Sequence, residues 1–103
     1  MNAVLEQPAT GTYSAKHMRK PISFFYATPD AKAVNLMGDF NNWDPKSLPM
    51  ERRVDGWWSI QVPLTHGHHH YLFVVDGRPE LDPHATGTVQ VDRYSTVSLI
   101  AVS

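Results

Sequence analysis

Hydrophobic and polar residues alternate along several short runs of this chain, and residues that favour turns separate the runs. An apolar side chain at every second position is the mark of a β-strand with one buried face. The pattern predicts strands over residues 22–28, 33–37, 50–53, 57–62, 70–75 and 95–102, with irregular chain or short strands at 81–83 and 86–91.

The alternation also predicts which side chains form the core. In the first strand, Phe24 and Tyr26 share one face while Phe25 lies on the other. In the strand at 57–62, Trp57 is expected at the surface or an edge. The side chains expected to point inward include Trp58, Ile60, Val62, Tyr71, Phe73 and Val75.

Turn residues define how the strands are connected. Asp55-Gly56 and Asp76-Gly77 are hairpin signals, and residues 63–67 are expected to form a connector. Short strands at turn-punctuated intervals, without a sustained helical period, predict an all-β sandwich. We expect one domain over residues 21–103, preceded by a flexible tail over residues 1–20.

Composition and charge exclude several classes of function. The 103 residues carry a formal net charge of −1 and no basic stripe, which argues against nucleic acid as a partner. The chain has no cysteine, so it has no disulfide and no thiolate metal site. No apolar run approaches about 20 residues, and the N-terminus lacks the pattern of a secretory signal. We therefore expect a cytoplasmic protein that does not engage a membrane.

Neither catalysis nor a metal site is expected. The aspartates lie almost all in turns, where the carboxylate usually bonds the backbone. A glycosidase needs two carboxylates across a cleft, which so small a sandwich seldom offers. His66 and residues 68–70 form a histidine tract, but on a strand His68 and His70 face away from His69. A half-buried His69 is therefore favoured over a zinc site, and we expect no catalytic residue, metal or cofactor.

The stretch GDFNNWDP at residues 38–45 combines turn residues with a large aromatic side chain. Gly38 tolerates unusual backbone angles, and Asn41 and Asn42 can bond their own backbone. Trp43 is thereby placed on a loop just after a strand. Two interpretations stay open from these residues alone: a core anchor, and an exposed platform for a planar ligand or a sugar ring.

This stretch resembles the G-x-F-N-x-W signature of carbohydrate-binding module family 48. The family includes the glycogen-binding domain of the AMP-activated protein kinase β subunit and the isoamylase-type early-set domains of branching and debranching enzymes. Further pieces follow in the family's order: YATPDA at 26–31, DGWW at 55–58, GHHHYLFVVDG at 67–77 and DP at 82–83. The resemblance implies an immunoglobulin-like early-set β-sandwich of seven or eight mostly antiparallel strands.

The resemblance also implies a sugar-binding surface. In the family this surface uses the signature Trp, a Lys on the G-x-H-x-Y-K strand, a second Trp after the V-D-G turn, and a last loop before the final strand. Here Trp43 is kept, but Leu72 stands at the Lys position and Pro79 at about the position of the second Trp. The last loop, at 92–96, lacks the family's L-G-T-x-N motif.

Substitutes for the missing groups are available by residue type. Tyr94 is predicted to supply an aromatic face, and Arg78 or Arg93 a hydrogen-bond donor. Trp43, Tyr94, Leu72 and Arg78 are therefore the expected sugar-binding residues. Losing a stack and a charged hydrogen bond removes about 1–3 kcal/mol per contact, so binding of about 100 μM or weaker is expected, and loss of binding stays open.

Two functions remain open on the sequence. The first is a non-catalytic module that binds α-glucan, as glycogen or starch, by stacking a glucose ring on Trp43. The second is a protein-interaction or scaffold domain that has kept the early-set fold with weak or lost sugar binding. Such a domain would act on a glycogen-metabolising enzyme or a kinase-like partner, through Trp57, Phe25 or an exposed edge strand.

Overall fold

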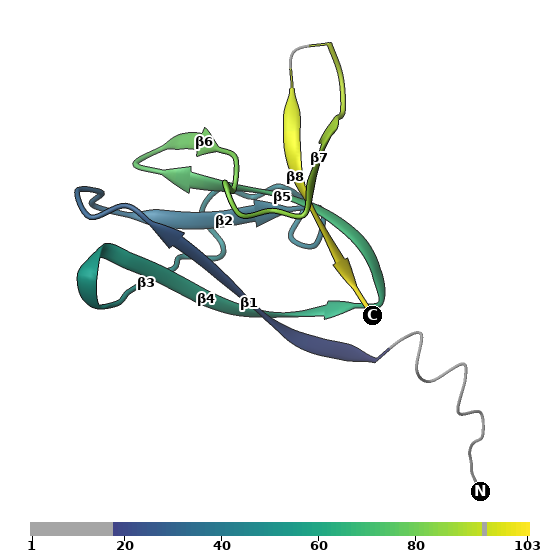
Figure 1. The fold of residues 1–103 in the computed structure, drawn as a ribbon, viewed down its shortest axis with the longest axis horizontal. Coiled ribbons are helices and arrows are strands. Elements are labelled where there is room, and N and C mark those ends of the chain that lie inside the picture. Colours follow the sequence, from purple (N-terminus) through teal and green to yellow (C-terminus); the bar gives the residue numbers. More distant parts are fainter. Residues whose placement is uncertain (1–17, 94) are drawn as a thin grey trace, which may run out of the picture.

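The structure, a computed structural model, describes residues 18–93 and 95–103, and these residues form a sandwich of two antiparallel β-sheets (Figure 1). This architecture confirms the predicted fold class. A 3₁₀ turn spans Val54–Gly56. The strands are β1 Arg19–Ala27, β2 Val34–Gly38, β3 Glu51–Arg52, β4 Trp57–Thr65, β5 Gly67–Val75, β6 Arg78–Glu80, β7 Gly87–Gln90 and β8 Thr96–Val102.

The first sheet has the order β1-β4-β3 and is built on a long β1–β4 pair. The Thr28 N–H donates to the Gly56 carbonyl at 2.9 Å. Because hydrogen-bonded and non-hydrogen-bonded pairs alternate along an antiparallel ladder, this bond shows that the even-numbered residues of β1 are the ones that bond to β4. Pro21 lies opposite Pro63, and this odd-numbered position of β1 is a non-hydrogen-bonded pair of the ladder. The predicted connector at 63–67 is therefore wrong: Pro63 costs the β1–β4 ladder no bond, and β4 continues through it to Thr65.

The second sheet has the order β2-β5-β8-β7, with β6 also paired to β5. The second half of β5 pairs with β2 and β6, and its first half pairs with β8. β5 therefore carries His68, His69, His70 and Leu72 through the middle of this sheet.

The core between the sheets is aromatic. Phe73 and Leu36 are fully buried, as is most of Phe24. Phe24 packs edge-on against Tyr71 with ring centroids 5.0 Å apart, and Tyr26 lies 4.7 Å from Phe73. The predicted inward set is confirmed, with Ile60 partly buried against the cluster and the others buried within it. Trp57 is 40% exposed, as predicted.

The two predicted hairpin signals both form turns. Asp55 and Gly56 have φ values of 59° and 78°, and Asp76 and Gly77 have values of 50° and 85°. The Asp76 carboxylate accepts the N–H groups of residues 32 and 33 at 2.9 Å each, and these bonds hold its pKa below the ordinary value. This carboxylate ties the β5–β6 turn to the chain entering β2.

The boundary predicted between tail and domain stays a prediction. β1 begins at Arg19, and residues 1–17 lie outside the described part of the chain. Among the described residues, no helix is long and apolar enough to cross a membrane.

Candidate functional site

The loop after β2 is held together by one side chain, that of Asn41. Its Oδ1 accepts the Gly38 N–H at 2.9 Å, and its Nδ2 lies 3.1 Å from the Asp44 carbonyl and 2.9 Å from Ser47 Oγ. A weaker contact of 3.4 Å reaches the Leu36 carbonyl. The asparagine of the signature therefore acts as an internal brace that closes the loop on itself.

Gly38 lets this loop approach β5 closely. A Cβ atom at Gly38 would lie 2.5 Å from the Phe40 ring and 2.6 Å from the His70 carbonyl oxygen. The Asp39 N–H donates to that same carbonyl at 3.0 Å. The glycine of the signature is thus required by space, since any side chain would push the loop away from the strand.

Trp43 is fixed by the same loop in an unusual backbone conformation. Asn42 and Trp43 have φ values of 58° and 57°, in the left-handed region that costs a bulky residue about 1–2 kcal/mol. The Trp43 N–H donates to the Gly38 carbonyl at 2.9 Å. The side chain is half-buried, so it is neither a core anchor nor a fully exposed plate. The hydrogen bonds of the loop offset the cost of this conformation, which sets the direction of the indole.

The Trp43 side chain lines a hollow of about 340 Å³ on the outer face of the second sheet, hereafter the Trp43 hollow. Its apolar lining comes from Trp43, Leu72, Val91 and Val97. Val97 is 4% exposed yet lies outside the main core cluster, which places it under this second apolar surface. The polar lining residues are Asp39, His70 and Ser95.

Asp39 and His70 form a fixed polar pair at this hollow. One Asp39 oxygen accepts the His70 N–H at 2.9 Å and lies 3.7 Å from His70 Nδ1. The other lies 3.3 Å from Nδ1 of His69, whose side chain is mostly buried, as expected for that residue. Neither Asp39 nor His70 was among the predicted site residues, although the period of β5 puts His70 on the same face as Leu72.

The structure brings two of the four predicted site residues together. Trp43 and Leu72 line the Trp43 hollow. Arg78 does not line it: it lies opposite Val75, whose side chain faces the core, so the two share the inner side of the sheet. Pro79 lies opposite Val74, on the face that carries Leu72. Tyr94 lies outside the described residues.

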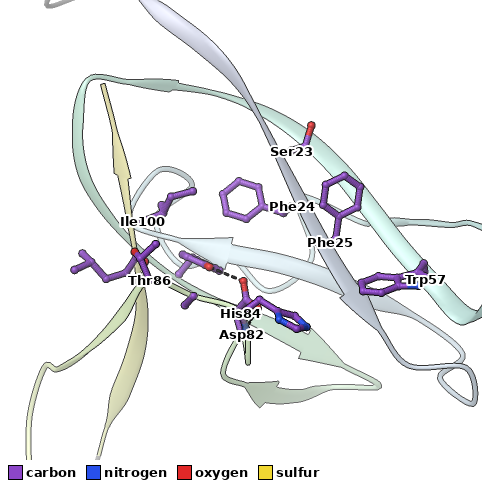
Figure 2. A pocket seen from close by; sticks show the side chains of 11 residues that line it. Ser23, Phe24, Phe25, Trp57, Asp82, His84, Thr86 and Ile100 are labelled. Carbon is purple, nitrogen blue, oxygen red and sulfur yellow. Dashed lines mark hydrogen bonds between the residues drawn. The ribbon is translucent and has the colours of Figure 1, made fainter.

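A larger hollow of about 530 Å³ lies between β1 and the second sheet, whose Tyr71, Leu99 and Ile100 also line it, and is hereafter the β1 slot. Figure 2 shows Phe24, Phe25 and Trp57 on one side of it and His84 and Thr86 on the other. The Tyr71 hydroxyl donates to Asp82 at 2.6 Å inside the slot, and burial together with this bond raises the Tyr71 pKa. Its lining is mainly apolar.

The aspartates at and near the two hollows are engaged in structural hydrogen bonds. Asp44 and Asp82 each accept an N–H two residues later, which is the turn role predicted for them. Asp39 accepts the His70 N–H, and Asp76 caps the chain before β2. Within residues 18–93 and 95–103, no three histidine or acidic side chains are placed to hold a metal ion together.

Known sequences place this fold and loop in a family. The family model "Carbohydrate-binding module 48 (Isoamylase N-terminal domain)" matches residues 12–95. A 1,4-alpha-glucan branching enzyme of Novosphingobium aromaticivorans is 36% identical over 87 residues, which cover 78% of this chain and 12% of that enzyme. One from Bradyrhizobium diazoefficiens is 38% identical over 56 residues, covering 54% of this chain and 8% of the enzyme.

The match to the family model spans most of the chain, and the relatives are far longer than the aligned segment. The loop built by Gly38, Asn41 and Trp43 lies within the matched residues. This chain belongs to carbohydrate-binding module family 48.

Proposed function

We propose that this domain is a non-catalytic module that binds α-glucan chains by stacking a glucose ring on Trp43. The observation that carries the proposal is the Trp43 hollow itself. A half-buried indole on a braced loop lies beside an apolar floor, and Asp39 and His70 form a polar pair at the same hollow. Sugar rings need this combination, because they present apolar C–H faces and a rim of hydroxyls.

Asp39 and His70 would supply polar contacts to the sugar in place of the Lys that the family has at the position of Leu72. The Asp39 carboxylate accepts hydrogen bonds from sugar hydroxyls, and the His70 ring offers a nitrogen two residues before Leu72. Leu72 then supplies apolar contact in place of a charged donor. Tyr94, which follows Arg93 and precedes the lining residue Ser95, remains our candidate for a second aromatic face.

The choice of α-glucan rests on the relatives. The proteins named above are called 1,4-alpha-glucan branching enzymes, and the part that aligns with this chain is a small fraction of each. A module of this family attached to such an enzyme favours glycogen- or starch-like chains as the ligand. The described turn-bound carboxylates offer no acid–base pair across a cleft, which supports a binding role without catalysis.

A second candidate function is a protein-interaction domain with weak or lost sugar binding. Leu72 and Pro79 favour it, because both lie on the face of the sheet that carries the Trp43 hollow, without the hydrogen-bond donor and aromatic face of the family. The partner in that case would be a glycogen-metabolising enzyme or a kinase-like complex.

Affinity electrophoresis separates the two candidates. Wild type should migrate more slowly in a native gel containing glycogen than in a plain gel, and Trp43→Ala should lose this retardation. Trp57→Ala is the matched control, since it removes an exposed indole from the other sheet and should leave retardation unchanged. Equal migration of folded wild type in both gels, or retardation that survives Trp43→Ala, would overturn the proposal.

A further inference from the structure

β1 has a neighbouring strand on one side only. In the sheet order β1-β4-β3 its outer edge, nine residues long, faces no other strand within the described part of the chain. A strand edge presents unpaired N–H and C=O groups, which bind another extended chain if nothing covers them.

The ladder phase identifies the unpaired groups. The bond from the Thr28 N–H to Gly56 shows that even-numbered residues of β1 exchange bonds with β4. Ser23, Phe25 and Ala27 therefore direct their main-chain N–H and C=O groups to the open edge. Pro21 has no N–H to offer, so the stretch that is competent to pair is centred on Phe25.

The other sheet edges are short or covered. Beside β2, the Leu36 N–H donates to the Leu48 carbonyl at 2.9 Å and the Met50 N–H donates to Val34 at 2.8 Å. β3 consists of two charged residues, and β7 has four residues. β4 also extends beyond β3, but the residues that face that side are Gln61, Pro63 and Thr65, of which Pro63 has no N–H and the Thr65 carbonyl is contacted by the His69 ring. Among the described strands, β1 is thus the longest edge without cover.

Charge does not protect this edge either. Soluble proteins usually place Lys or other charges along an open strand to prevent pairing. Here residues 21–29 contain no charged side chain, between Lys20 and Asp30. The formal net charge of −1 means that two copies of the chain repel each other little.

Exposed aromatic side chains gather at the same place. Phe25 is 54% exposed and Trp57 is 40% exposed, and both line the β1 slot. Figure 2 shows the two rings near each other, on the side of the slot formed by β1 and β4. Burying such surface would add hydrophobic stabilisation to main-chain hydrogen bonds.

We propose that the outer edge of β1 is an interface that pairs with β1 of a second copy of this chain. The pairing is antiparallel about a two-fold axis at Phe25, with Ser23 opposite Ala27 of the second copy. This register uses every free N–H and C=O of Ser23, Phe25 and Ala27 and leaves Pro21 outside the ladder. It joins the two three-stranded sheets into one and removes the Phe25 rings from water.

A second copy fits this edge better than a sugar chain does. The free groups are main-chain N–H and C=O groups at the spacing of a strand, which another extended chain can pair with in register and a sugar ring cannot. The self-complementary stretch 23–27 carries one large aromatic residue at the symmetry axis and no charge to clash with its own copy.

The first test is sedimentation of the full chain over a range of concentrations. Wild type should show a monomer–dimer equilibrium. Ser23→Pro and Ala27→Pro remove edge N–H groups that β4 does not use, so the domain should fold while the dimer dissociation constant rises at least tenfold. Ser23→Ala and Ala27→Ser are the matched controls, because they keep the N–H and should dimerise as wild type does.

The second test is a cross-link at the axis. The chain has no cysteine, so Phe25→Cys introduces its sole thiol. Directly opposed residues of a hydrogen-bonded pair have Cα atoms about 5.5 Å apart, within reach of a disulfide. Mild oxidation should give a covalent dimer, whereas Val54→Cys, at a 79% exposed position off this edge, should give little. A wild type that stays monomeric at about 1 mM, or a dimer unaffected by the proline variants, would overturn the proposal.

Discussion

Two aromatic surfaces of this domain differ in how they are built. The Trp43 hollow is organised by a braced loop: Asn41 and Gly38 fix the backbone, and Asp39 and His70 add oriented polar groups. The β1 slot is larger, is also mainly apolar with Asp82 and His84 in its lining, and borders an open strand edge. Size alone would favour the slot as the ligand site, but we propose the hollow, because its loop fixes the Trp43 indole beside Asp39 and His70. The two surfaces differ in what positions the aromatic side chain, a hydrogen-bonded loop in one and a strand in the other, and not in how apolar they are.

The largest effect is expected where the loop meets β5. Gly38→Ala places a Cβ within 2.6 Å of a main-chain oxygen, so the loop must move away from the strand. We expect a loss of about 2–3 kcal/mol in the free energy of unfolding, together with loss of glucan retardation. Urea denaturation measures the first effect. Gly87→Ala is the control, because its Cβ would meet only Leu99 at 3.8 Å; equal losses in both variants would contradict the steric account.

Removing the brace should have the next largest effect. Asn41→Ala deletes the bonds to Gly38, Asp44 and Ser47, and we expect a loss of about 2 kcal/mol in stability. Glucan affinity should fall as well, although Asn41 does not line the hollow, because Trp43 loses its fixed direction. Asn42→Gly provides the comparison: its positive φ suits glycine, so stability should change by about 0.5 kcal/mol or less.

The β1 slot should respond to pH at the alkaline end. Burial raises the pKa of Tyr71 above its ordinary value of 10.0, and the hydrogen bond to Asp82 adds to the shift. The stabilisation from this phenol is present below pH 10 and is lost as the pH rises above it, because the unfolded chain then ionises and the folded chain does not. Tyr71→Phe should cost about 1–2 kcal/mol at neutral pH and flatten the alkaline decline. Denaturation at pH values from neutral to about 11 checks both expectations; an unchanged alkaline slope would contradict them.

Restoring a family group should give a smaller effect of opposite sign. Leu72→Lys places a charged donor beside Trp43, and we expect several-fold tighter binding of a maltooligosaccharide, equivalent to about 1 kcal/mol. Titration calorimetry measures the change. Val54→Lys adds the same charge at an exposed position outside the hollow and should leave affinity unchanged. If both variants gain equally, the effect is one of net charge and not of the site.

The fold could be predicted from the sequence because its signal is local. Alternation placed Tyr71, Phe73 and Val75 on one face, and each is buried. The error at Pro63 arose because proline is tolerated in a strand only at certain ladder positions, and that phase depends on the partner strand. β6 was missed for a related reason, since its three exposed residues carry no hydrophobic period.

The site was only partly predictable. Trp43 and Leu72 came from the family resemblance, and they do line one hollow. The sequence could not place Asp39 beside His70, because the contact joins residues 31 positions apart through the register of β2 on β5. Arg78 looked available by residue type, but its register with Val75 puts it on the inner side of the sheet.

The measurement that tests the central claim most directly is a nuclear magnetic resonance titration of the three tryptophan indole N–H signals with maltoheptaose. The chain has three tryptophans, and each gives one signal. Trp58 is buried with its indole N–H bonded to the Thr28 carbonyl, and Trp57 borders the β1 slot. If glucose stacks on Trp43, the Trp43 signal should move with added sugar while the other two stay in place. Movement of the Trp57 signal with Trp43 unchanged, or no movement at millimolar sugar, would contradict the account.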